Sequence, residues 1–277
     1  MTPQVSSSNF ALKLSQYSPH NNSMRLLCLH GRGTNSDIFE SQLAPIANLL
    51  PERYVLDFLD GPCEVNAAPG VDSCSSGPYL AWHRRHFAKD LASAYTYVKT
   101  VIDEDGPYDG VIGFSQGAAL AASLLLSHQQ QAPSAPRLFK FAIFLSSVLP
   151  AAASEKMGVD STEYVVSYEK SLPEFFGLST LEIADMSSIE RAYLFKQFPS
   201  ANNPGGTLHY IDIPTLHILG SQDPFFNFGK IVVDLCDGKK REVLVHDGSH
   251  EVPRSEDYAQ KIALLIENIA ELSKINF

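Results

Sequence analysis

The sequence predicts an α/β fold in which a mostly parallel sheet carries helices on both faces. Three observations lead to this prediction. Short apolar runs alternate with longer segments of helical periodicity along most of the 277 residues. Most runs are almost continuously apolar, which is typical of parallel strands that are buried on both faces. One run, residues 108–112, leads directly into a Gly-x-Ser-x-Gly bend followed by strong helix formers.

The first half of the chain contains three predicted strands. Residues 24–30 form the first, and a helix capped by Asn35 or Ser36 follows it and stops at Pro51. Residues 53–59 form the second strand. Residues 63–79 are rich in Gly, Pro, Ser and Ala without any period, so we expect a long loop. A helix over residues 83–103 then precedes the strand at 108–112.

The second half repeats the pattern around one interruption. Strands are predicted at 138–148, 214–220 and 241–246, with a helix at 225–236 and a closing amphipathic helix. Residues 150–206 break the alternation, and an insertion at this place would cover the sheet edge as a lid. Residues 1–23 are rich in Ser, Asn and Gln and are expected to form a flexible arm. We therefore expect a single domain over residues 24–277.

Composition narrows the function and the compartment. The net charge of −10 argues against nucleic acid or an anionic membrane as a partner. Residues 1–23 lack the apolar core of a signal peptide, and no run is long enough to span a bilayer. The four cysteines show no C-x-x-C spacing, so neither a disulfide framework nor a zinc site is expected. The sequence therefore predicts a soluble, cytoplasmic protein without a bound metal.

The bend over residues 113–117 is the strongest chemical signal in the chain. A serine on a strained turn between a strand and a helix exposes its hydroxyl, and glycines two residues before and after avoid collisions there. An ordinary turn that happens to contain serine is the simpler alternative. Because both flanks fit the pattern as well as the bend itself, we predict that Ser115 is a nucleophile.

A serine nucleophile needs a base and a carboxylate, which in this architecture follow it in the order serine, acid, histidine. Asp223 lies just after the strand at 214–220 and is the predicted acid, although it also resembles the cap of the next helix. Asp212 precedes that strand and belongs to the wrong edge of the sheet. Asp60 ends a strand but comes before Ser115 in the chain.

The predicted base is His250, in the loop directly after the last strand. His217 and His246 lie within strands, where histidines with satisfied hydrogen bonds in the core are the better account. His83 and His86 flank two arginines at the start of a predicted helix and are expected on a solvated face. A loop histidine without any role is the alternative for His250.

Acyl transfer also requires donors for the developing oxyanion. The backbone N–H of Gln116, the residue after the nucleophile, is one expected donor. The loop after the first strand is placed for the second, with Arg32 preferred and Gly31 or Gly33 possible. The same glycines resemble the start of a dinucleotide fingerprint, but its third glycine would fall at Ser36, so the sequence argues against a nucleotide cofactor.

Together these residues resemble the FSH family of serine hydrolases, which are α/β-hydrolases common in fungi and include polyketide-releasing thioesterases such as that of lovastatin biosynthesis. The motifs that carry the resemblance lie at residues 29–35, 38–39, 60–62, 77–79, 82, 113–118, 220–223 and 248–253. The resemblance implies an α/β-hydrolase fold and an esterase or thioesterase that uses Ser115, Asp223 and His250. It also implies, as a partner, the acyl carrier domain of a polyketide synthase.

The leading functional hypothesis is thus a cofactor-free serine thioesterase that releases a polyketide or similar acyl chain in secondary metabolism. We expect an apolar acyl pocket formed by the long loop and the lid, with candidate contacts at Tyr79, Trp82, Phe175, Phe176 and Tyr193. A carboxylesterase for small oxygen esters is the close alternative. A non-catalytic acyl-binding relative is the alternative from a different class.

Overall fold

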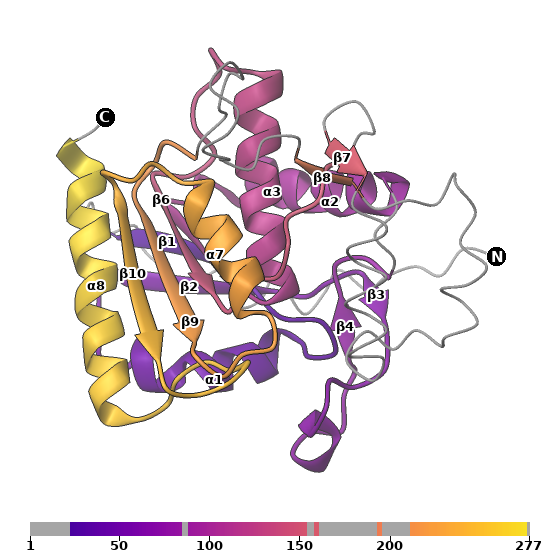
Figure 1. Ribbon diagram of the computed structural model, residues 1–277, viewed down its shortest axis with the longest axis vertical. Coiled ribbons are helices and arrows are strands. Elements are labelled where there is room, and N and C mark those ends of the chain that lie inside the picture. Colours follow the sequence, from indigo (N-terminus) through magenta and orange to yellow (C-terminus); the bar gives the residue numbers. More distant parts are fainter. Residues whose placement is uncertain (1–22, 85–87, 154–157, 161–192, 196–210, 276–277) are drawn as a thin grey trace.

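The computed structural model describes residues 23–84, 88–153, 158–160, 193–195 and 211–275 (Figure 1). Its strands are β1 (Met24–Leu29), β2 (Tyr54–Leu59), β3 (Cys63–Glu64), β4 (Leu80–Ala81), β5 (Gly110–Phe114), β6 (Phe141–Leu145), β7 (Gly158–Asp160), β8 (Tyr193–Phe195), β9 (Thr215–Gly220) and β10 (Arg241–His246). Its helices are α1 (Ser36–Ala47), α2 (Ala88–Asp105), α3 (Gln116–Gln131), α7 (Phe226–Asp234) and α8 (Glu256–Ile275), with a 3-10 turn at Val71–Ser73.

Six strands form one sheet in the order β10-β9-β6-β5-β1-β2, and every neighbouring pair is parallel. This confirms the predicted α/β class and each of its six strands to within a few residues. Of the two cap candidates for α1, the structure selects Asn35, whose side chain accepts a hydrogen bond from the N–H of Ile38 at 2.8 Å.

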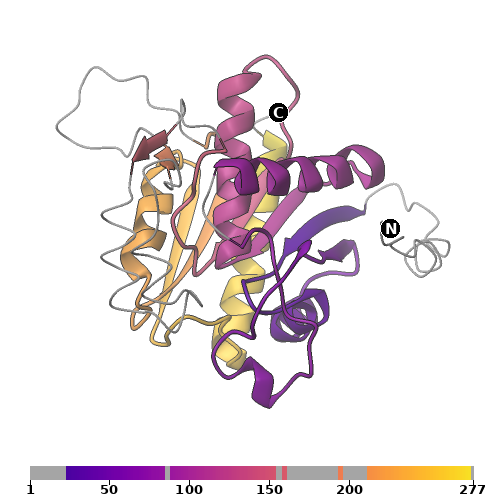
Figure 2. The same cartoon turned by 90° about the vertical axis from the view of Figure 1, so that its right-hand side faces the viewer.

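Helices cover both faces of the sheet, α1 and α8 on one face and α2, α3 and α7 on the other (Figures 1 and 2). Alternate residues of β1, β5 and β6 belong to the two cores, because side chains of a strand point to opposite faces. In β1, Leu27 and Leu29 join the core beneath α2 and α3, whereas Leu26 and Cys28 join the core beneath α1 and α8. The near-continuous apolar runs therefore reflect burial on both sides.

The connections place β5 at the centre of the molecule. The chain leaves β1 for β2 on one side and then returns to place β5 on the other side of β1. Such a reversal opens a crevice outside the carboxyl ends of the two strands, where open α/β sheets bind ligands. The residues that follow β1 and β5 therefore face each other across the expected site.

Two local predictions were wrong. The segment 63–79 is not wholly irregular, because β3 within it pairs antiparallel with β4 and a 3-10 turn lies between them. The helix predicted from residue 83 begins in the described chain at Ala88, and His83 precedes it. His83 is buried instead of solvated, because the segment that follows β4 crosses the carboxyl edge of the sheet.

Several expectations fall on residues that are not described. The arm at residues 1–23 lies outside, apart from its last residue, and so does most of the predicted lid at 150–206. Within that insertion the structure describes residues 150–153 and the antiparallel pair β7 and β8. In the part of the chain that is described, no helix is long and apolar enough to cross a membrane. All four cysteines lie in the described part and are free.

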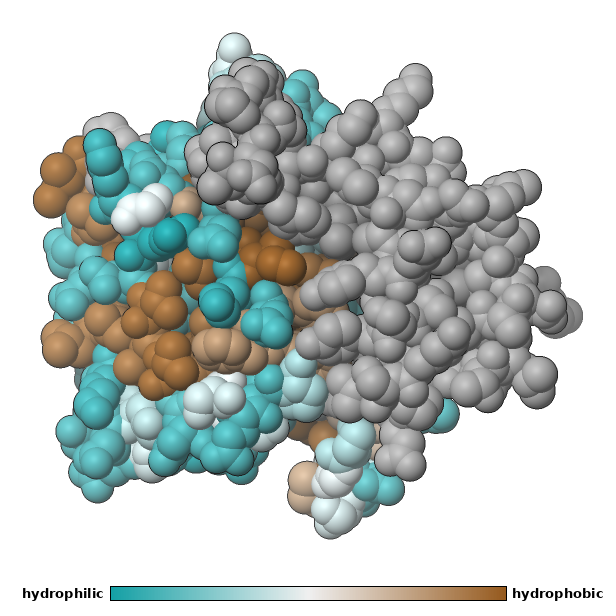
Figure 3. Space-filling model, in the orientation of Figure 1, coloured by the Kyte–Doolittle hydropathy of each residue, from teal (hydrophilic) through white to brown (hydrophobic). Residues whose placement is uncertain are grey.

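Strand β10 forms one edge of the sheet and exposes the side chains of Val243 and Val245. In the surface view, hydrophobic residues on this side lie in patches among hydrophilic ones (Figure 3). Charged residues, Arg241 and Glu242, begin the strand, and charges on an edge strand disfavour pairing with a strand of another molecule.

The buried histidine of β9 makes folding stability depend on pH. His217 is almost fully buried, and this burial lowers its pKa to about 3, whereas an unfolded histidine titrates near about 6.5. Between these values the unfolded chain binds a proton that the folded chain does not. The free energy of unfolding therefore falls as the pH drops through this window, with His217 contributing about 2 kcal/mol of loss by pH 5.

We expect a His217→Leu variant to lack that contribution, so that its free energy of unfolding changes less between pH 7 and pH 5 than that of the wild type. Urea titrations at the two pH values would measure the difference. Burial also lowers the pKa of His30 and of His246, and both residues are retained in the variant as an internal reference. Equal pH dependence in the two proteins would contradict the prediction.

Candidate active site

Ser115 sits on a strained bend between β5 and α3. Its backbone has φ 52° and ψ −114°, a conformation with positive φ outside the left-handed helical region that is rare for a residue other than glycine. The flanking glycines permit it. A Cβ at Gly113 would lie 2.5 Å from the Cα of Ala118, and one at Gly117 would lie 2.1 Å from the carbonyl oxygen of Leu29. The bend thus presses the start of α3 against the end of β1.

This packing makes Gly117 far less replaceable than an ordinary glycine. We expect Gly117→Ala to lower the free energy of unfolding by several kcal/mol, because the clash is with backbone, which cannot rotate away. Gly238 is the matched control, since a Cβ there meets nothing within 4 Å. Denaturant unfolding of both variants would test this, and similar small effects would show that the bend tolerates a side chain.

The side chains of Ser115, His250 and Asp223 form one hydrogen-bonded chain. His250 Nε2 lies 2.8 Å from Ser115 Oγ, and His250 Nδ1 lies 2.8 Å from Asp223 Oδ2. A carboxylate can only accept, so Nδ1 carries the proton and Nε2 is left to accept from the serine hydroxyl. The structure thereby brings together the three residues that the sequence analysis selected.

Asp223 uses its two oxygens for two purposes. While Oδ2 faces His250, Oδ1 accepts a hydrogen bond of 2.7 Å from the backbone N–H of Phe225. The cap and acid interpretations of Asp223 are therefore compatible, although α7 itself begins three residues later, at Phe226. With 2% of its side chain exposed, the carboxylate is held in one orientation.

The loops that carry the acid and the base are bound to each other. The N–H groups of Ser221 and Gln222 donate to the carbonyls of His246 and Gly248 at 2.8 and 3.0 Å. The imidazole of His250 contacts two aromatic rings, with its centroid 5.3 Å from that of Phe114 and 5.0 Å from that of Phe225. Backbone pairing and ring packing together restrict the base to one position.

The peptide between Gly31 and Arg32 lies beside the serine. A Cβ at Gly31 would approach the Ser115 Cβ to 3.4 Å. On its other side, the Gly31 carbonyl oxygen accepts from Thr34 Oγ1 at 2.7 Å and faces His30 Nδ1, also at 2.7 Å. Because His30 Nε2 accepts from the N–H of Gly61 at 2.9 Å, Nδ1 is the donor.

The hydrogen bonds to the Gly31 carbonyl also fix the direction of the Arg32 N–H, since the C=O and N–H of a trans peptide point in opposite directions. Within the described residues, the N–H of Arg32 donates to no acceptor, whereas the N–H of Gly33 donates to the carbonyl of Leu80 at 2.8 Å. Gly33 is therefore the weakest of the three donor candidates. Gln116 opens α3, where the first N–H groups of a helix have no intrahelical acceptor.

The side chain of Gln116 anchors the segment after β4. Its Oε1 accepts from the N–H of Trp82 at 3.0 Å, and its Nε2 donates to the carbonyl of His83 at 3.0 Å. Trp82 is 1% exposed, and its indole N–H donates to the carbonyl of His30 at 2.7 Å. This role of Gln116 and His83 was not predicted from the sequence, because the contact joins residues 33 positions apart.

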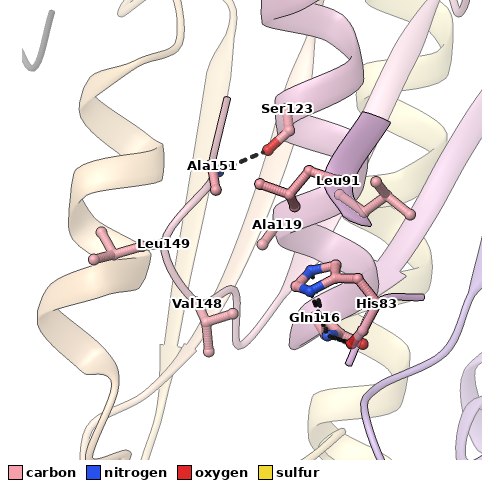
Figure 4. Close-up of a pocket in the computed structure, with 9 residues that line it drawn as sticks. His83, Leu91, Gln116, Ala119, Ser123, Val148, Leu149 and Ala151 are labelled. Atoms are coloured by element: carbon pink, nitrogen blue, oxygen red, sulfur yellow. Dashed lines mark hydrogen bonds between the residues drawn. The ribbon is translucent and has the colours of Figure 1, made fainter. Parts of the chain in front are cut away.

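A small cavity lies along α3 next to the bend (Figure 4). It spans about 240 Å³ when the space open to solvent is included, and its lining comes from α2, α3 and the segments after β4 and β6. Ser123 accepts a hydrogen bond from the N–H of Ala151 at 3.0 Å and fixes that segment on α3. The lining residues are His83, Leu91, Gln116, Ala119, Leu120, Ser123, Val148, Leu149 and Ala151.

Some of the aromatic residues predicted to line the acyl pocket make other contacts, and the side chains of the rest are not described by the structure. Tyr79 is half-buried, and its hydroxyl donates to the carbonyl of Ser75. Trp82 packs in the core and contacts the site through its two nitrogens. Phe175 and Phe176 lie outside the described residues, and Tyr193 begins β8, of which only the backbone is described.

Ser146 is a further feature that the sequence did not reveal. It follows β6 with φ 44°, and Ser115 and Ser146 are the described non-glycine residues with positive φ. Its hydroxyl lies 3.4 Å from the carbonyl of Glu251, next to the base. In the described part of the chain, no group of three or more His, Cys, Asp or Glu side chains is arranged to hold a metal ion.

A serine on a strand–helix bend, with its hydroxyl on an imidazole that a buried carboxylate orients, defines the class of serine hydrolases with an α/β-hydrolase fold. A comparison with protein families agrees with this class. Residues 20–262 match the family described as serine hydrolase (FSH1). The chain belongs to this family.

Curated relatives come from fungi. Esterase alnB of Emericella nidulans is 30% identical over 264 residues, which cover 84% of this chain and 92% of that protein. Hydrolase FUB4 of Fusarium oxysporum f. sp. lycopersici is 30% identical over 269 residues, with 90% and 100% covered. Esterase FPY3 of Fusarium mangiferae is 32% identical over 235 residues, with 83% and 89% covered.

Solved structures support the fold. The carboxylesterase of Bacillus cereus aligns with a TM-score of 0.51 at 15% identity, covering 89% of both chains. The monoacylglycerol lipase of Paleococcus ferrophilus aligns with a TM-score of 0.52 at 12% identity, covering 89% of this chain and 94% of that one. At such low identity the likeness concerns the α/β-hydrolase fold alone.

Proposed function

We propose that this serine hydrolase cleaves acyl thioesters by a double displacement at Ser115. The observation that carries the proposal is the hydrogen-bonded chain from Ser115 Oγ through His250 to Asp223, with 2.8 Å at both contacts. These distances are short enough for direct proton transfer between the serine and the imidazole. The strained backbone of Ser115 supports the same role, because it directs the hydroxyl out of the sheet.

In the first step Ser115 Oγ attacks the acyl carbonyl carbon and His250 Nε2 takes the hydroxyl proton. Asp223 orients and stabilises the imidazolium, and the N–H groups of Arg32 and Gln116 bind the oxyanion. The carbon–sulfur bond then breaks, and the thiol leaves with the proton from His250. In the second step water attacks the acyl-serine and His250 takes a proton from it. The bond between the acyl carbon and Ser115 Oγ then breaks, His250 returns the proton to Oγ, and the carboxylic acid departs.

The cavity beside the bend adjoins Gln116, the residue after the nucleophile. Apolar side chains, Leu91, Val148 and Leu149 among them, line it together with the polar His83, Gln116 and Ser123. Binding sites for acyl substrates commonly combine apolar walls with a few polar groups, so a recess at this place is compatible with the proposal. We extend the proposal to a polyketide or similar chain carried by the acyl carrier domain of a synthase, as the motif resemblance implies.

Hydrolysis of oxygen esters is the second candidate, and it uses the same residues. Two of the relatives, alnB and FPY3, carry the name esterase. An oxygen ester differs at the leaving group, so the same serine, base and oxyanion donors would serve. The two candidates therefore separate only by substrate preference.

The hydrolase proposal is tested by intact-mass measurement after treatment with a fluorophosphonate. We expect one adduct on the wild type and none on Ser115→Ala. Absence of an adduct on the wild type would favour a non-catalytic acyl-binding protein, and an adduct on Ser115→Ala would place the nucleophile elsewhere.

Substrate preference is tested by comparing kcat/KM for matched pairs, an acyl N-acetylcysteamine thioester and an ethyl ester of the same acyl group. We expect the thioester to be the better substrate across chain lengths. Equal or higher kcat/KM for the oxygen ester would overturn the thioesterase assignment in favour of the esterase, while leaving Ser115 as nucleophile.

A further inference from the structure

The carbonyl oxygen of His83 accepts hydrogen bonds from the side chains of both proposed oxyanion donors. Gln116 Nε2 lies 3.0 Å from this oxygen, and Arg32 Nη1 lies 3.2 Å from it. The same guanidinium nitrogen lies 3.2 Å from the carbonyl of Arg84. Two side chains from the ends of different strands thus converge on one short segment, residues 82–84.

The segment is also bound to the elements that carry the donors. The N–H of Trp82 donates to Gln116 Oε1 at 3.0 Å, so Gln116 holds the segment with both ends of its amide. The Trp82 indole donates to the carbonyl of His30, at the start of the loop that contains Arg32. Trp82 and His83 are buried, which shields these bonds from exchange with water.

An oxyanion site works only if its two donors keep a fixed separation. Here the donors belong to different elements, because Arg32 lies in the loop after β1 and Gln116 opens α3. No covalent link shorter than 80 residues joins them, so their separation depends on packing and hydrogen bonds. A common acceptor for both side chains supplies such a constraint.

We propose that residues 82–84 act as a positioning strap. The side chains of Arg32 and Gln116 donate hydrogen bonds to the His83 carbonyl of this strap and thereby set the distance between their own backbone N–H groups. This inference rests on the proposed function, since it assigns those N–H groups to the oxyanion. It adds a role for two side chains that touch no reacting atom. The strap makes the two halves of the oxyanion site mutually dependent.

The test uses variants that keep both backbone N–H groups. Gln116→Glu retains the acceptor for Trp82 but replaces the donor to His83 with a carboxylate oxygen, which repels that carbonyl. Arg32→Met removes both guanidinium bonds and keeps much of the side-chain length. We expect each to lower kcat about tenfold with KM within about twofold, less than the 10²–10³-fold loss for removing a donor outright.

The second readout is the inhibition constant of a trifluoromethyl ketone, which forms a tetrahedral oxyanion on the serine. We expect it to rise in parallel with the loss of kcat, because both report the oxyanion site. Arg241→Met is the matched control. Arg241 also donates to two carbonyls, those of Val233 and Cys236, but at the opposite end of the sheet. It should lower thermal stability and leave kcat and the inhibition constant within about twofold.

The double variant tests the shared acceptor. If both side chains hold the same carbonyl, losing the second costs less once the first is gone, so kcat falls by less than the product of the single effects. Multiplicative losses would overturn the strap, as would single variants within twofold of the wild type or effects confined to KM. Should Arg32→Met fail to fold, Arg32→Lys retains one donor and is expected to show a smaller loss of kcat.

These outcomes are separable from failure of the proposed function. If the wild type hydrolyses esters or thioesters and forms the fluorophosphonate adduct on Ser115, the function stands, and unaffected strap variants refute the strap alone. If the wild type forms no adduct, the proposed function fails first, and the strap inference fails with it.

Discussion

Replacement of Ser115 by alanine is expected to lower kcat by about 10⁶-fold, with little change in KM. The serine oxygen is the atom that forms the acyl intermediate, and its partner His250 Nε2 at 2.8 Å cannot substitute for it. Steady-state hydrolysis of a chromogenic ester by the purified variant measures the loss, after the same preparation has been shown to fold.

Ser127→Ala is the matched control for that experiment. Ser127 is a buried serine in α3, the helix that follows Ser115, and it lies about 18 Å farther along that helix at about 1.5 Å per residue. Its replacement should leave kcat within about twofold. Residual activity of Ser115→Ala above about one percent of the wild type would mean that another group supplies the nucleophile, and the assignment of the bend would have to be abandoned.

Replacement of Asp223 by asparagine is expected to lower kcat by about 10⁴-fold while preserving the fold. The reason lies in the second bond of Asp223. The N–H of Phe225 already holds Oδ1 at 2.7 Å, and it will select the amide oxygen of the asparagine. The amide NH₂ then faces His250 Nδ1, which must accept, so the ring proton moves to Nε2 and the base can no longer take the serine proton.

Asp212→Asn provides the comparison, because Asp212 precedes β9 and pairs with Arg137 at the exposed opposite edge of the sheet. We expect kcat within about twofold of the wild type for this variant. Hydrolysis assays with the same ester, stopped at fixed times, measure kcat of both variants. A loss of less than about tenfold for Asp223→Asn would show that another group orients His250.

Local patterns predicted most of the sheet and the identity of the three interacting side chains. The apolar run of β5, the two glycines around Ser115 and the position of His250 after β10 are all local features. These features can be predicted from the sequence because each depends only on its own neighbours in the chain. The order serine, acid, histidine then selected among the remaining acids and histidines without any knowledge of distances.

Contacts between residues far apart in the chain could not be predicted from such local patterns. His83 was expected on a solvated helix face, yet it is buried against Gln116, because the antiparallel pair β3 and β4 carries it across the sheet edge. Trp82 was expected to line the pocket, and it instead packs in the core with its indole on the His30 carbonyl. Neither position follows from periodicity, since a two-residue strand has none.

The sequence by itself determined the fold class, the strained serine and the residues that meet it, because burial periodicity and backbone strain are properties of short segments. Only the tertiary structure decided how these residues are held in place. It paired the acid and base loops, and it fixed the peptide after Gly31 through Thr34 and His30. It also joined Arg32 and Gln116 on one carbonyl. Such contacts join distant residues and arise only when the chain closes on itself.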